Sequence, residues 1–197
     1  MKRILILAIL LMSSLAWAGS TTVVVGQGGG GGEGGCAGGS DGTIGTSTTN
    51  ASITTEATTT AFWSSYTPSE DGTVTYGHVR ISYLAAGCTV NVAIWDSSTG
   101  ARLVDGTAQA GAGGANTLYN FALDESYCLA TGTTYLVGFV IDGVDYDVTF
   151  QQYDGSIDSM KWDGATGGNT VSNLTLGSAT TLESGEQLTV WFDNSAT

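Results

Sequence analysis

Three aromatic side chains have the types and positions best suited to binding chemistry. Trp95, Trp191 and Tyr153 each fall on the polar face of a segment in which polar and apolar residues otherwise alternate. A flat aromatic ring offers apolar surface to the C–H face of a sugar, and neighbouring amides can hydrogen-bond the sugar hydroxyls. The alternative is that the tryptophans point outward but lie under a loop or under the N-terminal segment. The pattern predicts a carbohydrate-binding face made by these rings and by the amides of Asn91, Gln151 and Gln187.

A group of aspartates around one turn could hold a metal ion. Asp142, Asp145 and Asp147 lie within six residues of one another, and calcium takes about six to eight oxygen ligands. Their spacing does not match the loop that repeats aspartate at alternate positions before a glycine. Loop aspartates also serve turn geometry alone. A structural calcium ion is therefore the one cofactor that the sequence suggests.

Catalytic chemistry has little support in the sequence. The single histidine, His78, stands beside Arg80 on the polar face of a predicted strand, and no GxSxG motif presents a nucleophile. Two carboxylates are enough for a glycosidase, but 18 acidic residues always offer a pair. We therefore expect a protein that is not an enzyme.

The three cysteines predict a disulfide. Cys88 and Cys128 both lie in the β-rich region, so we expect them to pair. Closing this loop of about 40 residues would stabilise the fold by about 4 kcal/mol. Cys36 is then free, pairs with Cys36 of a second copy, or takes the partner assigned to Cys88. The cysteine spacing matches no metal-binding signature.

These residues are carried by segments that alternate with the period of a β-strand. In Cys88–Asp96, CTVNVAIWD, the apolar face consists of Cys88, Val90, Val92 and Ile94. In Thr73–Leu84, the same alternation turns Val79, Ile81 and Tyr83 inward and His78, Arg80 and Ser82 outward. Further strands are predicted at Thr60–Tyr66, near Thr117–Leu123, and at Tyr135–Ile141, Tyr146–Tyr153 and Gln187–Asp193, with weaker candidates at Met160–Asp163 and Thr170–Leu176.

No segment after the first 18 residues shows a convincing helical period. About eight to ten strands at short spacing, joined by glycine-rich turns, are typical of two antiparallel sheets packed face to face. The sequence therefore predicts an all-β, jelly-roll-like sandwich with a glycine-rich N-terminal extension.

The chain divides into three parts. Residues 1–18 read as a signal peptide, because Lys2 and Arg3 precede the apolar run Ile4–Met12 and a small-x-small cleavage sequence. Residues 19–59 are rich in Gly, Thr and Ser and are predicted to be an extension or linker, in which Val23–Val25 could pair with a sheet edge. Residues 60–197 are the predicted sandwich domain. We expect a secreted protein with no membrane span after cleavage.

The charge of the chain excludes one class of partner. The part after residue 18 has all 18 acidic residues against Arg80, Arg102 and Lys161, so its formal charge is 3 minus 18, or −15. Such a surface repels phosphate backbones, which argues against nucleic acid.

Two motifs carry a resemblance to a known family. VNVAIWDSSTG at Val90–Gly100 and TGTTYLVGFVIDG at Thr131–Gly143 resemble a pattern in jelly-roll modules of bacterial secreted and surface proteins and of phage tail fibres. These modules are similar in fold to carbohydrate-binding modules, and the likeness covers residues 60–197. The resemblance implies an extracellular module for adhesion, glycan contact or assembly, and it brings no catalytic signature.

Two functions follow as expectations. The first is a secreted, non-catalytic module for binding or adhesion, with carbohydrate or a cell-surface polymer as its partner. The alternative is a structural subunit of an extracellular fibre or surface layer, which would self-associate through the N-terminal segment and Cys36.

Overall fold

The computed structural model describes residues 36, 41–57, 59–111, 117–143, 146–165 and 170–196. The predicted signal peptide and the Val23–Val25 run lie outside this range. The part of the chain that is described holds no helix long and apolar enough to cross a membrane.

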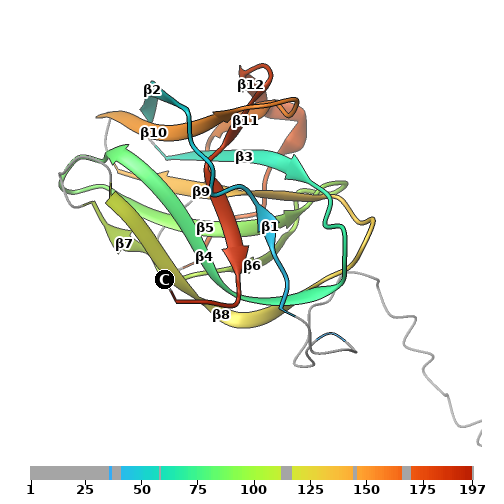
Figure 1. The fold of residues 1–197 in the computed structure, drawn as a ribbon. Coiled ribbons are helices and arrows are strands. Elements are labelled where there is room, and N and C mark those ends of the chain that lie inside the picture. Colours follow the sequence, from blue (N-terminus) through green and yellow to red (C-terminus); the bar gives the residue numbers. More distant parts are fainter. Residues whose placement is uncertain are drawn as a thin grey trace, which may run out of the picture.

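The fold is an all-β sandwich of two antiparallel sheets, as predicted (Figure 1). Sheet A consists of β1 (Ile44–Gly45), β2 (Ala51–Ala57), β4 (Gly72–Tyr83), β8 (Thr117–Leu129), β10 (Tyr146–Asp154), β13 (Glu186–Leu188) and β14 (Val190–Asp193). Sheet B consists of β3 (Thr60–Tyr66), β5 (Thr89–Asp96), β6 (Arg102–Asp105), β7 (Gln109–Ala110), β9 (Tyr135–Asp142), β11 (Ser159–Asp163) and β12 (Thr180–Glu183). A short 3-10 turn, η1 (Leu176–Ser178), precedes β12.

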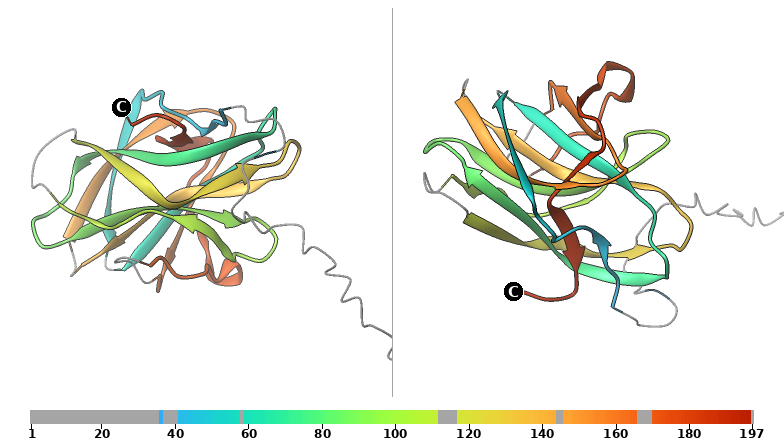
Figure 2. Two further views of the ribbon diagram at one scale, coloured as in Figure 1. Left: turned by 90° about the horizontal axis from the view of Figure 1, so that it is seen from below. Right: turned by 45° about the horizontal axis from the view of Figure 1, so that its top comes forward.

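The long strands change sheet at each step along the chain. β3, β5 and β9 belong to sheet B, whereas β4, β8 and β10 belong to sheet A, and the sheets form the two layers seen in Figure 2. Thr189 separates β13 from β14: its N–H donates to the Gln151 carbonyl at 3.1 Å, and its carbonyl accepts from Arg80 N–H at 3.4 Å. The C-terminal segment therefore runs between β4 and β10. Its first strand, β13, pairs with β10, and its second strand, β14, pairs with β4.

The core lies between the sheets and follows the predicted alternation. Cys88, Val90, Val92 and Ile94 are all buried there, as expected. Phe62, Phe139 and Phe150 meet at the centre with ring centroids 5.0 to 5.3 Å apart. Each large apolar side chain removed from water contributes about 1.5–3 kcal/mol. The two-residue period places these side chains on one face of each strand, and their burial drives the two sheets together.

The N-terminal boundary predicted for the domain is wrong. Residues 41–57 were expected to be linker, but Asp41 bridges Thr73 and β1 pairs with β14. β2 pairs with β10 over seven residues, and the hydroxyls of Thr54 and Thr149 lie 2.7 Å apart. Because this segment is rich in β-branched threonine, it fits an edge strand as well as it fits a linker. The sandwich therefore includes the chain from Asp41 onward.

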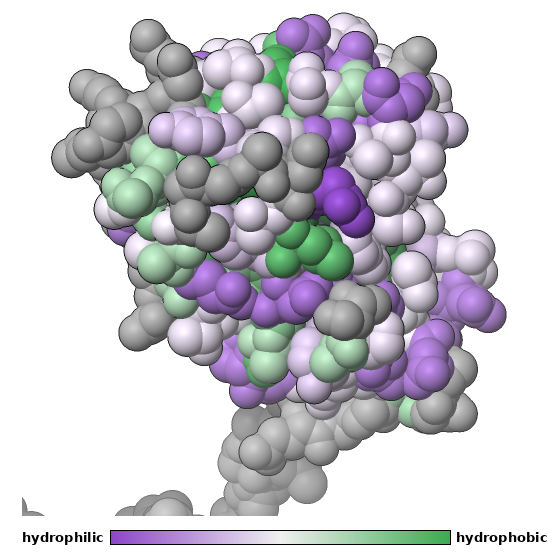
Figure 3. All heavy atoms as spheres, turned by 60° about the vertical axis from the view of Figure 1, so that its left-hand side comes forward, coloured by the Kyte–Doolittle hydropathy of each residue, from purple (hydrophilic) through white to green (hydrophobic). Residues whose placement is uncertain are grey.

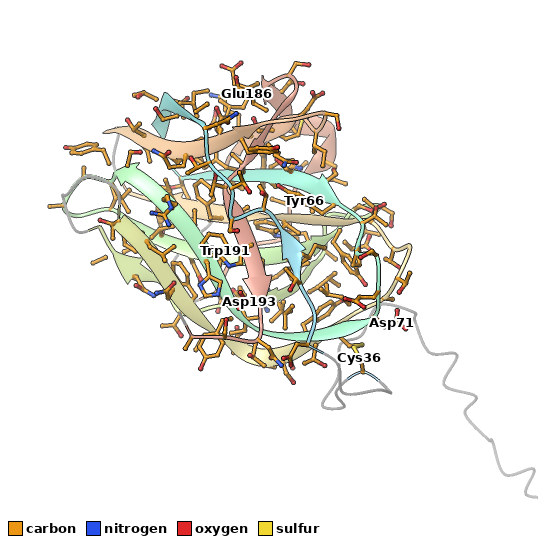
Figure 4. The ribbon with its side chains drawn as sticks, viewed as in Figure 1. Cys36, Tyr66, Asp71, Glu186, Trp191 and Asp193 are labelled. Atoms are coloured by element: carbon orange, nitrogen blue, oxygen red, sulfur yellow. A yellow bond between two sulfur atoms is a disulfide. The ribbon has the colours of Figure 1, made fainter. Side chains whose placement is uncertain are left out.

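The predicted pairing of Cys88 with Cys128 is also wrong. Cys36 and Cys128 form the disulfide, with their Cα atoms 5.3 Å apart (Figure 4), and Cys88 is a buried thiol. Tyr127 and Leu129 of β8 point into the core, so the intervening Cys128 points to the other side of its strand, where Cys36 lies. Burial, with the charge of Asp142, raises the pKa of the Cys88 thiol.

A segment without regular pairing covers the outer face of sheet B. We call residues 170–176 the strap; the prediction of a strand at Thr170–Leu176 is wrong. Val171 N–H donates to Asp105 Oδ2 at 2.6 Å, and Leu174 N–H donates to the Gly100 carbonyl at 2.8 Å. The strap closes a second apolar cluster outside the main core, made of Ala61, Trp63, Ala93, Trp95, Leu136, Val140, Ala165, Val171 and Leu174.

Candidate functional site

The predicted aromatic platform is divided between the two sides of the sandwich. Trp95 belongs to β5 in sheet B, whereas Trp191 and Tyr153 belong to β14 and β10 in sheet A. All three point away from the central core, as predicted, but they point in two opposite directions. One ligand cannot contact all three.

Trp95 and Asn91 are covered and cannot reach a ligand. Trp95 is 0% exposed, and its indole Nε1 donates to the Ser172 carbonyl of the strap at 3.0 Å. Asn91 is buried on the same face, and its Nδ2 donates to the Gly106 carbonyl at 2.7 Å. The expectation that Trp95 lies open to solvent is therefore wrong, and the alternative of a tryptophan under a loop is what the structure shows.

Trp191 is part of a packed polar cluster on sheet A (Figure 4). Trp191 is 8% exposed, and its ring stacks on His78 with centroids 4.8 Å apart, while its Nε1 donates to Asp193 Oδ2 at 3.1 Å. His78 Nε2 lies 3.0 Å from Asp193 Oδ1, and His78 Nδ1 lies 2.8 Å from Asn120 Oδ1. The indole therefore has little surface left for a sugar.

The charges in this cluster favour an ionised Asp193. Burial alone raises the pKa of Asp193, but hydrogen bonds from Ser195 N–H and from His78 outweigh it and hold the pKa below its usual value. His78 lies on the polar face of its strand, as predicted, but it is fully buried there. Its ring nitrogens face an amide and a carboxylate, and neither faces a hydroxyl nucleophile.

A β-bulge in β4 creates the exposed part of sheet A. Ile81 lies opposite Phe150, but Tyr83 lies opposite the next residue back, Thr149, so Ser82 is the extra residue. The bulge turns Tyr83 outward, although the alternation of the sequence assigns it inward. Among the described residues, Tyr83 is the one large hydrophobic residue that is exposed, with an exposed fraction of 46%.

Polar side chains of β10 continue this surface. Thr149, Gln151 and Tyr153 alternate outward and are half-buried. The Gln151 amide is oriented at both ends, because its Nε2 donates to Ser82 Oγ and its Oε1 accepts from Thr49 Oγ1 at 2.6 Å. We call the surface of Arg80, Ser82, Tyr83, Thr149, Gln151 and Tyr153 the open face.

The open face has an aromatic residue toward each end. Tyr83 is level with Thr149, and Tyr153 lies four residues further along β10, which corresponds to about 13 Å. Gln187 lies opposite Tyr153 and is 8% exposed. It therefore has little surface available to a ligand. Figure 3 views the side of the molecule where β4 ends and β10 begins, and it shows polar residues interspersed with small apolar areas.

The calcium prediction stays a prediction. Asp142 is half-buried and accepts a hydrogen bond from Thr59 Oγ1 at 3.1 Å. Asp145 and the side chain of Asp147 lie outside the described part of the chain. Within that part, no three His, Cys, Asp or Glu residues are grouped so that they could hold a metal ion.

Searches with this chain against protein-family models, curated proteins and solved structures gave no significant match. The open face is therefore interpreted from its own residues: two tyrosines, a fixed amide, two hydroxyls and a guanidinium on one side of sheet A.

Proposed function

We propose that this chain is a secreted, non-catalytic module that binds carbohydrate through the open face of sheet A. The observation that carries the proposal is the β4 bulge, which places Tyr83 on the same surface as Gln151 and Tyr153. Aromatic rings that flank a fixed amide match the needs of a sugar chain, whose rings have apolar C–H faces and hydroxyl edges.

The geometry fits a short stretch of polymer better than a single sugar. The two tyrosines are about 13 Å apart along β10, which is longer than one sugar ring. A chain lying along the strand would stack on Tyr83 and Tyr153 and hydrogen-bond the residues between them. The hydrogen bonds from Thr49 and to Ser82 hold the Gln151 amide in place before any ligand arrives, which lowers the entropy lost on binding.

Two further observations support an extracellular location. The Cys36–Cys128 disulfide is the kind of bond that persists in oxidising compartments, and the first 18 residues have the pattern of an export signal. The alternative function, a fibre subunit cross-linked through Cys36, loses its cross-link because that sulfur is bonded within its own chain.

The test is affinity electrophoresis of Tyr83→Ala, Tyr153→Ala and the double variant through gels containing soluble polysaccharides. We expect each single change to weaken retention by about twofold to tenfold, because an aromatic contact contributes about 0.5–1.5 kcal/mol beyond area burial. The matched control is Trp162→Ala, which removes a half-buried aromatic side chain from sheet B. Thermal melts of all variants check that the fold is kept.

Two outcomes would count against the proposal. If no polysaccharide retards the wild-type protein, or if the tyrosine variants are retained as strongly as it is, the open face is not a glycan site. Light scattering on the same samples detects the alternative function, since a subunit that assembles through its N-terminal segment would form large assemblies in the wild type and in these variants alike.

A further inference from the structure

Arg80 is the positively charged residue of the open face. It belongs to β4, two positions before Ser82, and its side chain alternates outward with His78 and Ser82. Two residues along a strand correspond to about 7 Å. Arg80 N–H donates to the Thr189 carbonyl, and Thr189 N–H donates to the Gln151 carbonyl. The Arg80 backbone is thus fixed beside the strand that carries Gln151.

The guanidinium of Arg80 has no carboxylate partner among the described residues. Arg102 lies 2.6 Å from Asp105 and Lys161 lies 3.9 Å from Asp163, so the other two basic residues of the sandwich are paired. The Nε–H of Arg80 is buried and finds no hydrogen-bond acceptor in the described structure. This atom is out of a ligand's reach, but Arg80 as a whole is half-buried. A guanidinium has four further N–H donors on its Nη atoms, and these are the donors that a ligand oxygen would meet.

The chemistry of this group indicates an acidic sugar. A guanidinium is a planar fork of N–H donors that matches a carboxylate with two parallel hydrogen bonds. In a chain of formal charge −13 with 18 acidic residues, an arginine that no described carboxylate neutralises is available to a ligand carboxylate. A neutral sugar would need only hydroxyl partners, which the glutamine and serine already present.

The overall charge limits how many carboxylates the ligand has. A polyanion with an acid on every unit would be repelled along its whole length by the acidic surface, and salt at about 0.15 M screens this only beyond about 8 Å. A single acid group placed at Arg80, with neutral sugars on both sides, gains the short-range contact and avoids most of the repulsion. The charge pattern therefore favours a sparse carboxylate.

We propose that the open face binds a glycan with one carboxylate among neutral sugars, such as a uronic or sialic acid unit, and that Arg80 binds this carboxylate. The inference rests on the proposed function, because it names the ligand class of the same face. Arg80 gives the selectivity for the acid, and the two tyrosines give the contact with the neutral units.

The experiment compares ligands that differ in the carboxylate alone. Glucuronoxylan is paired with its carboxyl-reduced form, sialyllactose with lactose, and polygalacturonate serves as the densely charged polymer. Binding is measured for the wild type, Arg80→Gln and Arg80→Lys. The control is Lys161→Gln, which makes the same change of charge on the other sheet, and thermal melts check the fold.

We expect the wild type to bind at least one acid-bearing ligand about tenfold to a hundredfold more tightly than its neutral partner. Arg80→Gln should abolish this preference and keep the weaker neutral binding, and Arg80→Lys should keep part of it because lysine keeps the charge without the fork. Polygalacturonate should bind more weakly than the sparse acidic ligands, and the difference should shrink as salt is added.

The outcomes separate the two proposals. Binding that needs Tyr83 and Tyr153 but is equal within every ligand pair, or is unchanged in Arg80→Gln, overturns the acidic-sugar inference and leaves the glycan function standing. Tighter binding of polygalacturonate than of the sparse acidic ligands also overturns the inference. Absence of binding to every ligand overturns both proposals.

Discussion

The outer faces of the two sheets share a sequence pattern but differ in how they are covered. Each sheet turns a tryptophan outward from an alternating strand, Trp95 from sheet B and Trp191 from sheet A. On sheet B the strap adds Val171 and Leu174 and buries Trp95 in a second apolar cluster. On sheet A, Trp191 is held by a histidine and an aspartate, and the exposed surface lies beside it. Alternation thus decides which way a side chain points, and a distant segment decides whether it meets solvent.

The largest expected effect tests whether sheet B is a covered face. Replacing Trp95 with alanine removes a fully buried indole and its hydrogen bond to Ser172, so we expect a loss of about 3–5 kcal/mol in the free energy of unfolding. Tyr153→Ala on the open face should change it by about 1 kcal/mol or less. Urea denaturation of both variants measures the difference.

A small loss in Trp95→Ala would contradict the structure, because it would mean that the strap does not seal the indole from water. Trp95→Phe is the matched control. It keeps an aromatic ring under the strap and loses the N–H donor, so its loss should lie between those of the wild type and the alanine variant.

The sequence predicts the fold more completely than it predicts the site. β5, β9 and the second half of β4 follow from apolar residues at every second or every successive position, and the buried faces of β5 are those that the alternation assigns. The pattern is local, so it survives wherever a strand is regular. It fails at Tyr83, because a bulge shifts the phase of the alternation by one residue and no residue type signals it.

The remaining errors concern contacts between distant segments. The burial of Trp95 depends on a strap more than 70 residues away, and the Cys36–Cys128 bond joins residues 92 positions apart. The expected pairing of Cys88 with Cys128 rests on the region in which both residues lie, but pairing depends on which side of a strand each sulfur faces. The alternation correctly predicts that Arg80 points outward, but only the structure shows that it forms no ion pair with a described carboxylate.

The second prediction compares how each sheet holds the chain that crosses it. The strap is held on sheet B by hydrogen bonds and apolar contacts, whereas the chain before β1 is tied to β8 of sheet A by the disulfide. Replacing Cys36 and Cys128 together with serine should cost about 2–5 kcal/mol, because the bond closes a long loop in the unfolded chain. Cys88→Ala, a change at the buried thiol, should cost about 1–2 kcal/mol.

Thiol labelling of the unfolded, unreduced protein checks the pairing directly. Cys88 should be the labelled residue. Label on Cys36 with none on Cys88 would restore the pairing expected from the sequence and refute the one described.

The third prediction loosens the strap without removing an aromatic residue. Asp105 is fully buried, and its two oxygens accept from Val171 N–H and from Arg102 Nη1, each at 2.6 Å. Asp105→Asn leaves one of these donors without an acceptor, so we expect a loss of about 1–3 kcal/mol. Hydrogen exchange at the Val171 amide should speed up while exchange in β10 stays slow. Equal acceleration in both places would mean that the strap is not an independent unit.

The smallest expected effect is a pH dependence of stability. It arises where β6 of sheet B approaches β8 of sheet A. Partial burial, together with the hydrogen bond and the charge of Asp105, raises the pKa of Asp124 to about 6, while Arg102 opposes the rise. A carboxyl whose folded pKa exceeds its unfolded value contributes stability that is complete below pH 4 and is lost as the pH rises through 6.

Asp124→Asn removes this loss. The free energy of unfolding of the variant, relative to that of the wild type, should therefore increase between pH 4 and pH 7. The increase should be less than about 1 kcal/mol, because Asp124 is largely exposed. Urea midpoints of the two proteins at pH 4, 5.5 and 7 measure the gain. A constant difference across this range would contradict a raised pKa of Asp124 beside Asp105.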